Sequence, residues 1–295
     1  MALTEIRQYF KPESPSEAVE LLRQYGSGAR ILGGGTFLHG LAARGLGLKL
    51  EALIDLQDAG LAYVKAEPDA LAIGSATTLS AVAAAAPIRQ GVEFAAVADA
   101  LACPPAQIRN MATVGGCLAA ASPLFDLPVA LMALDASVRV LGPRGEREIL
   151  LNEFFLDYFE SALQPDELLA EVRIPRLPPN SASAFFKLET NANDLALLNV
   201  AVRLTLTAAG MCREPRVVVG GGVGKVPVRA PSSENVLAGK HITPGLVAEA
   251  GEKVTSDVHP VSDHRTSAKY RSAVAKVLVR RTVGRVLERL GLQHA

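Results

Sequence analysis

Two glycine-rich segments, far apart in the chain, constrain this protein more than any other feature. Residues 31–38 read Ile-Leu-Gly-Gly-Gly-Thr-Phe-Leu, and residues 108–118 read Ile-Arg-Asn-Met-Ala-Thr-Val-Gly-Gly-Cys-Leu. Each contains a short run of apolar residues, adjacent glycines that carry no side chain, and a threonine. Without a Cβ atom in the way, main-chain N–H groups can converge on an anion. Two such loops in one chain predict a diphosphate gripped from both sides.

The first glycine segment alone fits two interpretations. It is either an ordinary tight turn between a strand and a helix, or a phosphate-binding turn to which the hydroxyl of Thr36 adds a donor. Its spacing does not match GxGxxG, because Leu38 stands where the last glycine belongs. A Rossmann dinucleotide site is therefore disfavoured.

Composition narrows the class of protein. A length of 295 residues predicts two domains, and a hydrophobic fraction of 49% is enough for buried cores. The formal net charge is zero, which argues against a nucleic-acid partner. No apolar run approaches the roughly 18 residues of a membrane span, so no such span is expected.

The three cysteines and the N-terminal residues indicate the cellular compartment of the protein. The cysteines form no CxxC pair, which favours a reducing cytoplasm, and they are too few and scattered to ligate an iron–sulfur cluster. The first residues lack the features of a signal peptide. We therefore expect a cytoplasmic protein.

Hydrophobic periodicity predicts an α+β chain with a break at residues 175–180, Pro-Arg-Leu-Pro-Pro-Asn. Before the break, strands at 29–32 and 53–56 flank a short helix and the first glycine turn, as in a β-α-β unit. Further segments before the break are a strand at 71–74, helices at 81–86, 92–101 and 127–134, a hairpin at 137–150 and a strand at 168–174. Beyond it we expect strands at 184–188, 197–207 and 216–220 and helices at 244–254 and 267–290.

Several catalytic motifs are absent. Residues 220–225 approach a P-loop, but Val219 stands where its first glycine belongs and Val226 follows the lysine in place of Ser or Thr. This stretch is predicted to be a strand end and turn. The five histidines show no metal-ligand spacing, so no metal site is expected. No GxSxG elbow supports hydrolysis.

Two charged residues each allow two roles. Asp126 either caps the apolar helix that follows it or accepts hydrogen bonds from ribose hydroxyls. Lys187 lies in an apolar strand, where alternation points it to solvent, or its ammonium group neutralises electron density on a reduced cofactor.

The order of these motifs resembles the FAD-binding medium subunit of molybdenum hydroxylases, a family that includes carbon monoxide dehydrogenase, the nicotinate dehydrogenases and the flavin domain of xanthine dehydrogenase. The family's first loop usually reads Ala-Gly-Gly-Thr-Asp-Leu, similar to residues 33–38. Its second reads Ile-Arg-Asn-x-x-Thr-Ile-Gly-Gly-Asn-Leu, similar to residues 108–118, and is followed by Ala-Ser-Pro and Asp-Leu, as at 121–123 and 126–127. Further similarity lies at 166–169, 186–187, 226–230, 262–265 and 270–271.

The resemblance implies a fold and a site. It implies a two-lobed FAD-binding domain of the PCMH type at 1–177, with sub-lobes at about 1–57 and 58–177. A smaller domain of antiparallel sheet and helices, of the CO dehydrogenase flavoprotein C-terminal type, would follow at 180–295. Pro104 would lie near FAD, Asp126 would bind its sugar or adenine end, and the main chain of Leu169 and the side chain of Lys187 would face the isoalloxazine. The residues that would hold the diphosphate are Ile31, Leu32, Gly33, Gly34, Gly35, Thr36, Phe37, Leu38, Thr113, Val114, Gly115, Gly116 and Cys117.

The chain departs from the family pattern at three places. Phe37 replaces an acid, Cys117 replaces an asparagine, and Thr190-Asn191 stand near where many relatives carry arginine. The first two leave main-chain contacts to phosphate intact, whereas the third alters the expected surroundings of the flavin edge.

The function implied by the resemblance is electron transfer. FAD would take electrons from 2Fe-2S clusters of a small partner subunit and pass them to an external acceptor, while a large molybdopterin-binding subunit oxidises the substrate. The assembly would be a dimer of heterotrimers. Two alternatives stay open: a stand-alone FAD-dependent oxidoreductase, and a structural subunit that has lost FAD.

Overall fold

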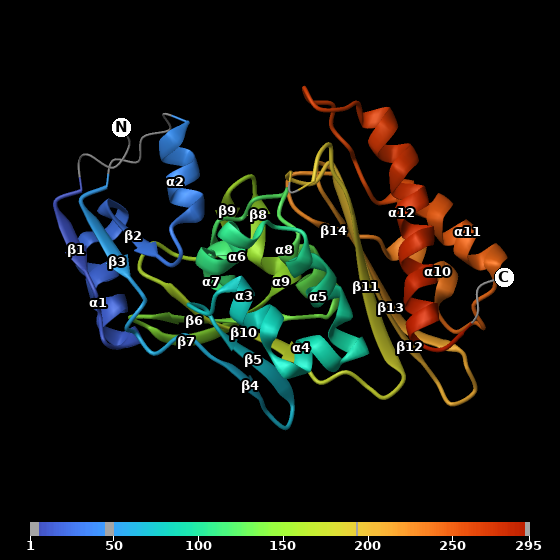
Figure 1. Ribbon diagram of the computed structural model, residues 1–295, viewed down its shortest axis with the longest axis horizontal. Helices are drawn as coiled ribbons and strands as arrows, with labels where there is room; N and C mark the ends of the chain where they lie inside the picture. The colour runs from blue at the N-terminus through green and yellow to red at the C-terminus, as the bar shows by residue number, and fades with distance from the viewer. Residues whose placement is uncertain (1–5, 45–49, 193, 293–295) are drawn as a thin grey trace.

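Three sheets follow one another along the long axis of the molecule (Figure 1). The computed structural model describes residues 6–44, 50–192 and 194–292. Within these residues the first sheet has the strand order β1-β3-β2, the second β4-β5-β10-β6-β7 and the third β11-β12-β13-β14, and a small two-stranded sheet pairs β8 with β9. The predicted α+β class is confirmed.

The first sheet is parallel and carries the predicted β-α-β unit. Strand β3 pairs in parallel with both neighbours, with Ile54 opposite Ile31 of β2 and opposite Phe10 of β1. The glycine turn at residues 33–35 and helix α2 follow β2 directly in the chain. The elements are β1 (Gln8–Phe10), α1 (Pro15–Tyr25), the 3-10 turn η1 (Gly26–Gly28), β2 (Ala29–Leu32), α2 (Thr36–Ala43) and β3 (Ala52–Asp55).

The second sheet is antiparallel, and the helices between β5 and β6 lie against it. The elements are β4 (Val64–Ala66), β5 (Ala70–Gly74), α3 (Leu79–Ala84), α4 (Ala86–Gln90), η2 (Val92–Phe94), α5 (Ala95–Ala102), α6 (Ala106–Met111), α7 (Val114–Ala119), α8 (Leu127–Ala133), β6 (Ser137–Gly142), β7 (Gly145–Leu150), α9 (Leu151–Phe154), β8 (Phe155–Asp157), β9 (Glu160–Ser161) and β10 (Leu168–Pro175).

Two predictions in this region were wrong in detail. The helix expected at 81–86 ends at Ala84, because Pro87 has no N–H to continue it and its ring would clash with the preceding turn. The second glycine segment is not a loop. It forms α6 and α7, joined at residues 112–113, so that Gly115 and Gly116 lie in the first turn of a helix.

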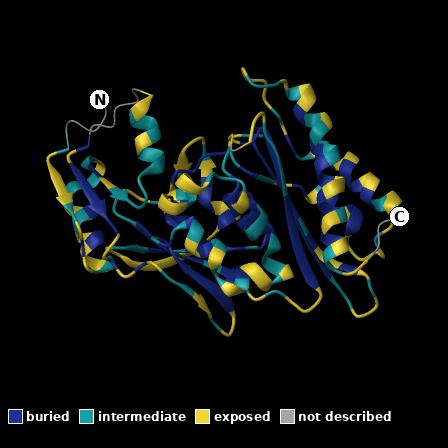
Figure 2. Ribbon diagram, viewed as in Figure 1, coloured by how far each residue is buried: buried dark blue, intermediate teal, exposed yellow. Residues whose placement is uncertain are grey.

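The third sheet is buried on both faces, as the dark blue ribbon of Figure 2 shows. Alternate residues of β12 face opposite sides: Val200 and Val202 pack in the core with α12, whereas Ala201 packs with the core of the second sheet. The elements are β11 (Ser181–Leu188), β12 (Leu198–Leu206), β13 (Cys212–Gly220), β14 (Val228–Arg229), α10 (Pro231–Leu237), α11 (Pro244–Lys253), η3 (Val254–Ser256) and α12 (Ala268–Arg289).

Helix α8 joins the second and third sheets. All seven of its residues are buried, as expected for a helix that is apolar on every side and has protein on every side. Charged pairs reinforce the junction: Asp99 of α5 accepts two hydrogen bonds from Arg289 of α12, at 2.7 and 2.8 Å. The two halves of the chain therefore form one continuous body.

Candidate functional site

The two glycine segments pack directly against each other. A Cβ atom on Gly34 would lie 1.5 Å from the carbonyl oxygen of Met111, and one on Gly33 would lie 2.4 Å from the hydroxyl oxygen of Thr113. These glycines are required because protein atoms fill the space beside them. The contact, which we call the glycine seam, joins the first sheet's turn (residues 33–35) to the link between α6 and α7 (residues 111–113).

The seam leaves a turn of free main-chain donors at the start of α2. Gly35 adopts a left-handed conformation (φ 69°) and precedes the first helical residue, and the first helical hydrogen bond runs from His39 N to Gly35 O at 2.8 Å. Within the described part of the chain, the N–H groups of residues 34–38 have no acceptor. Ile31 and Leu32 end β2, while Thr36, Phe37 and Leu38 form the first turn of α2, and all are half-buried. This arrangement suits an anion.

The corresponding donors of α7 are already occupied. Val114 N donates to Thr77 O at 3.0 Å, and Gly115 N donates to Ser75 O at 2.8 Å. Gly116 N donates to the hydroxyl of Thr113 at 3.2 Å, a helix cap. A phosphate on this side would have to displace one of these bonds, so the two predicted halves of the grip are unequal.

A buried charge cluster connects the start of α8 to the third sheet. Lys187 of β11 lies directly opposite Asn199 of β12, so both side chains share one face. Asp126 Oδ2 lies 3.1 Å from Lys187 Nζ, and Asp126 Oδ1 accepts from Asn199 Nδ2 at 2.8 Å. Glu189 Oε2 lies 2.9 Å from the same lysine nitrogen. The side chain of Lys187 is 6% exposed, so the alternative that it points to solvent was wrong.

The protonation of this cluster follows from burial and opposite charge. Burial by itself lowers the pKa of Lys187, but Asp126 and Glu189 outweigh it and hold the pKa above the usual lysine value. Burial raises the pKa of Asp126, and the opposing effects of Lys187 and Asn199 only partly offset that rise. The lysine therefore carries its charge at neutral pH.

The structure excludes one of the two roles expected of Asp126. It stands at the N-cap position of α8, but its side chain makes no capping hydrogen bond. Its carboxylate oxygens contact Lys187 and Asn199 instead. No sequence motif singles out Asn199, a fully buried amide in an apolar strand, whose Oδ1 atom has no partner among the described residues.

Three further predicted residues are Cys117, Pro104 and Leu169. Burial, with a smaller effect of Asp126, raises the pKa of the Cys117 thiol to about 12, so Cys117 is a neutral thiol near that carboxyl group. Pro104 is half-buried in the turn between α5 and α6. Leu169 is buried on β10 at an irregularity in its pairing with β6, beside Ala170, whose carbonyl accepts from Ser75 N at 2.9 Å.

Phe37, which replaces the family's acid, joins an aromatic cluster. Its ring stacks on Phe159 at a centroid distance of 6.0 Å and an interplanar angle of 27°. It also meets Phe125 edge-on at 6.1 Å. Since Phe125 precedes Asp126, the aromatic cluster connects the free donors of α2 to the buried charge cluster.

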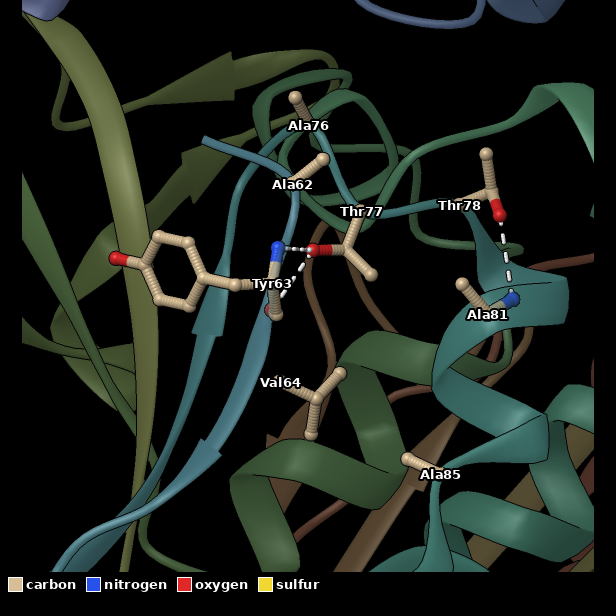
Figure 3. A pocket seen from close by; sticks show the side chains of 8 residues that line it. All are labelled: Ala62, Tyr63, Val64, Ala76, Thr77, Thr78, Ala81 and Ala85. Atoms are coloured by element: carbon tan, nitrogen blue, oxygen red, sulfur yellow. Dashed lines mark hydrogen bonds between the residues drawn. The ribbon is translucent and has the colours of Figure 1, made fainter. Parts of the chain in front are cut away.

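A pocket of about 360 Å³ lies beside Thr77, whose carbonyl oxygen accepts from Val114 N at the start of α7 (Figure 3). The hydroxyl of Thr77 accepts from Tyr63 N and donates to Tyr63 O, both at 2.9 Å, and Thr78 caps α3 through Ala81 N. None of the predicted site residues lines this pocket, which is lined by Ala62, Tyr63, Val64, Ala76, Thr77, Thr78, Ala81 and Ala85. It is a neighbour of the candidate site and not the site itself.

The described residues contain neither a metal-binding cluster nor a membrane-spanning helix. Among the described residues, no cluster of three or more His, Cys, Asp or Glu side chains could hold a metal ion, and His294 lies outside those residues. No helix in the described ranges is both long and apolar enough to cross a membrane.

The fold, an α+β region followed by a further sheet with helices, is that of a flavoprotein family. Residues 4–177 match the family described as FAD binding domain in molybdopterin dehydrogenase, and residues 183–286 match the CO dehydrogenase flavoprotein C-terminal domain. The chain belongs to this family of FAD-binding medium subunits of molybdenum hydroxylase-type dehydrogenases. It is an FAD-binding oxidoreductase subunit.

Individual relatives match along nearly their whole length. The chain is 33% identical to the 6-hydroxypseudooxynicotine dehydrogenase complex subunit alpha of Paenarthrobacter nicotinovorans, over 95% of this chain and 94% of that one. It is 31% identical to the carbon monoxide dehydrogenase medium chain of Afipia carboxidovorans, over 95% and 96%. The solved carbon monoxide dehydrogenase of Hydrogenophaga pseudoflava superposes with a TM-score of 0.90 at 28% identity, covering 96% of this chain and 98% of that one.

The glycine seam predicts a steric effect at Gly34. Gly34→Ala would force a Cβ atom into the Met111 carbonyl group and should destabilise the flavin-free protein by about 3 kcal/mol or more, measured by urea unfolding. Gly40→Ala, in the helix that follows this turn and with nothing within 4 Å, is the control and should be neutral or stabilising by about 0.5–1 kcal/mol. Equal stabilities of Gly34→Ala and wild type would contradict the seam.

The buried charge cluster predicts a pH effect. Lys187→Met removes the charge that offsets the burial of Asp126, so the folded-state pKa of Asp126 rises further above its unfolded value. The folded state then binds the proton more tightly than the unfolded state, and stability is lost as pH rises through that raised pKa. At neutral pH we expect a loss of about 3 kcal/mol in the flavin-free protein.

The control for this effect is the double variant Lys187→Met/Asp126→Asn. It has no carboxyl group at position 126 to titrate, so the pH-dependent part of the loss should disappear. Unfolding free energies that fall equally with pH in the single and double variants would show that Asp126 is not the group responsible.

Proposed function

We propose that this subunit transfers electrons through an FAD whose diphosphate binds the free main-chain N–H groups of residues 34–38. The observation that carries the proposal is that these donors lack acceptors within the described chain, in a turn that the glycine seam holds in place. The unpartnered hydroxyl of Thr36 would add a donor. The N–H groups at the start of a helix need acceptors, and an anion would satisfy them.

The buried charge cluster would serve the opposite end of the cofactor. Lys187 would face the isoalloxazine together with the main chain of Leu169, while Asp126, which accepts a hydrogen bond from Asn199, holds the lysine nitrogen in place. Asp126 would also bind the sugar or adenine end of the cofactor. Pro104 and the neutral thiol of Cys117 would border the same region, and residues 113–116 would support the diphosphate turn from behind.

When bound, FAD supplies the capacity to take up two electrons and release them singly or as a pair. The chain's own residues bind and orient the cofactor and exclude water from its ring. No side chain is needed as a general acid or base. The ammonium group of Lys187 would place a positive charge next to the ring, and the carboxyl groups of Asp126 and Glu189 beside it oppose that charge.

The partners follow from the same proposal. Electrons would come from 2Fe-2S clusters of a small subunit, a large subunit would hold the molybdenum cofactor and the substrate, and an external acceptor would take the electrons. We infer a dimer of heterotrimers in the cytoplasm. Relatives named medium chain or subunit of a complex support this assembly. The proposed domain bounds are 1–177, with sub-lobes at about 1–57 and 58–177, and 180–295.

The proposal predicts non-covalent FAD. The purified chain should carry close to one FAD, with flavin absorbance, and acid precipitation should release all of it, because no histidine or cysteine stands in a recognisable flavinylation context. Flavin left in the acid pellet would contradict non-covalent binding. A folded protein that binds no added FAD would instead support a structural subunit.

Partner subunits are tested in the same preparation. Co-purification with two further chains, one of them rich in cysteine, supports the electron-transfer subunit. A chain that purifies alone with FAD and reduces that FAD with its own substrate would establish the stand-alone oxidoreductase.

A further inference from the structure

The hairpin formed by β8 and β9 exposes apolar side chains beside the candidate cofactor site. Leu156, Tyr158 and Phe159 are all exposed, Phe159 by 59%. In Figure 1 the hairpin lies above α6, α7 and α8, on the side of the molecule from which α2 projects. The stack of Phe159 on Phe37 joins the tip of this hairpin to the first turn of α2, where the free donors are.

The tip of the hairpin is held in a strained conformation. Phe159 has a φ of 58°, a region that non-glycine residues rarely occupy, and its N–H group donates to Ala121 O at 3.1 Å. Ala121 has a φ of 43°. Two strained residues bonded to each other persist only where their surroundings hold them, and such strain is concentrated at ligand clamps and switches.

A second contact ties the base of the hairpin to the C-terminal part of the chain. Asp157 Oδ2 accepts from Lys225 Nζ at 2.6 Å, and Asp157 Oδ1 accepts from Tyr158 N at 2.7 Å. Lys225 belongs to the glycine-rich turn at 220–225 that resembled a P-loop in sequence. The hairpin therefore contacts the α2 turn through Phe159, the second sheet's helices through Ala121 and the third sheet through Lys225.

We propose that the β8–β9 hairpin is a strap across the entrance of the cofactor site, latched by the Phe37–Phe159 stack, and that FAD enters and leaves only when the stack parts. This inference rests on the proposed FAD site at residues 34–38. The exposed apolar tip allows the strap to lift without losing a large buried surface. Phe125, which meets Phe37 edge-on, would not move with the hairpin.

A latch has a kinetic signature that a direct cofactor contact lacks. If exchange occurs only in the open state, association and dissociation rates both scale with the fraction of open molecules. Weakening the latch raises both rates and leaves the Kd nearly unchanged. Removing a direct contact to FAD raises the dissociation rate alone and raises the Kd by the same factor.

The experiment measures both rates in the flavin-free protein reconstituted with FAD, by the change in flavin fluorescence on mixing and on displacement. Phe159→Leu keeps a large apolar side chain at the strained position but removes the ring stack. We expect association and dissociation to become about three- to tenfold faster, in parallel. Phe37→Leu should have the same effect, and the double variant should add little, because the two rings form one contact.

Tyr158→Leu is the matched control. Tyr158 is exposed on the same hairpin and makes no ring stack within the described chain, so its replacement should leave both rates unchanged. Unchanged rates in Phe159→Leu would overturn the strap, and so would a faster dissociation alone, which would make Phe159 a direct contact. A wild-type protein that binds no FAD would refute the proposed function itself and is distinguishable from both.

Discussion

The contact on which the site depends is the packing of Gly34 against the carbonyl group of Met111. The distance of 1.5 Å from that oxygen to a notional Cβ atom leaves room for no other residue. Because the first sheet's turn sits this close to the link between α6 and α7, Gly35 can take its left-handed conformation and α2 can begin with its donors facing outward. The start of α7, directly after this link, is fixed to the segment that follows β5 by the bonds from Val114 to Thr77 and from Gly115 to Ser75.

A second constraint is the register of β11 and β12. It places Lys187 opposite Asn199, and the pair then meets Asp126, which comes from the other domain. Two carboxyl groups and one amide around a single lysine make the cluster costly to break, since removing one partner leaves a buried charge. This cluster and the fully buried helix α8 hold the second and third sheets together.

Local patterns in the sequence were sufficient for most of the fold. The glycine turn after β2, the hairpin of β6 and β7 and the chain break near Pro175 depend on neighbouring residues, so spacing and turn chemistry predict them. The helix break near Pro87 was not predicted, because the run of alanines before it is typical of a continuous helix. The packing role of the glycines was not predicted: Gly33, Gly34 and Gly115 make room for protein atoms, which only the packing of distant segments reveals.

The site was less accessible to sequence reasoning for the same physical reason. Asn199 carries no motif, and its importance follows from a strand register and from Asp126, which is 73 positions away. The pairing of Lys187 with Asp126 and Glu189 likewise depends on tertiary contacts. Resemblance to a family named both residues but could not show that they touch.

The central claim is that the diphosphate binds the free donors of residues 34–38 and not the occupied donors of α7. Amide ¹⁵N and ¹H chemical shifts of the flavin-free protein, followed while FAD is added, test it most directly. The account predicts large downfield shifts of the amide protons of residues 34–38 and small changes at Val114 and Gly115, whose N–H groups keep their bonds to Thr77 and Ser75. Large shifts confined to residues 114–116, with residues 34–38 unchanged, would contradict it.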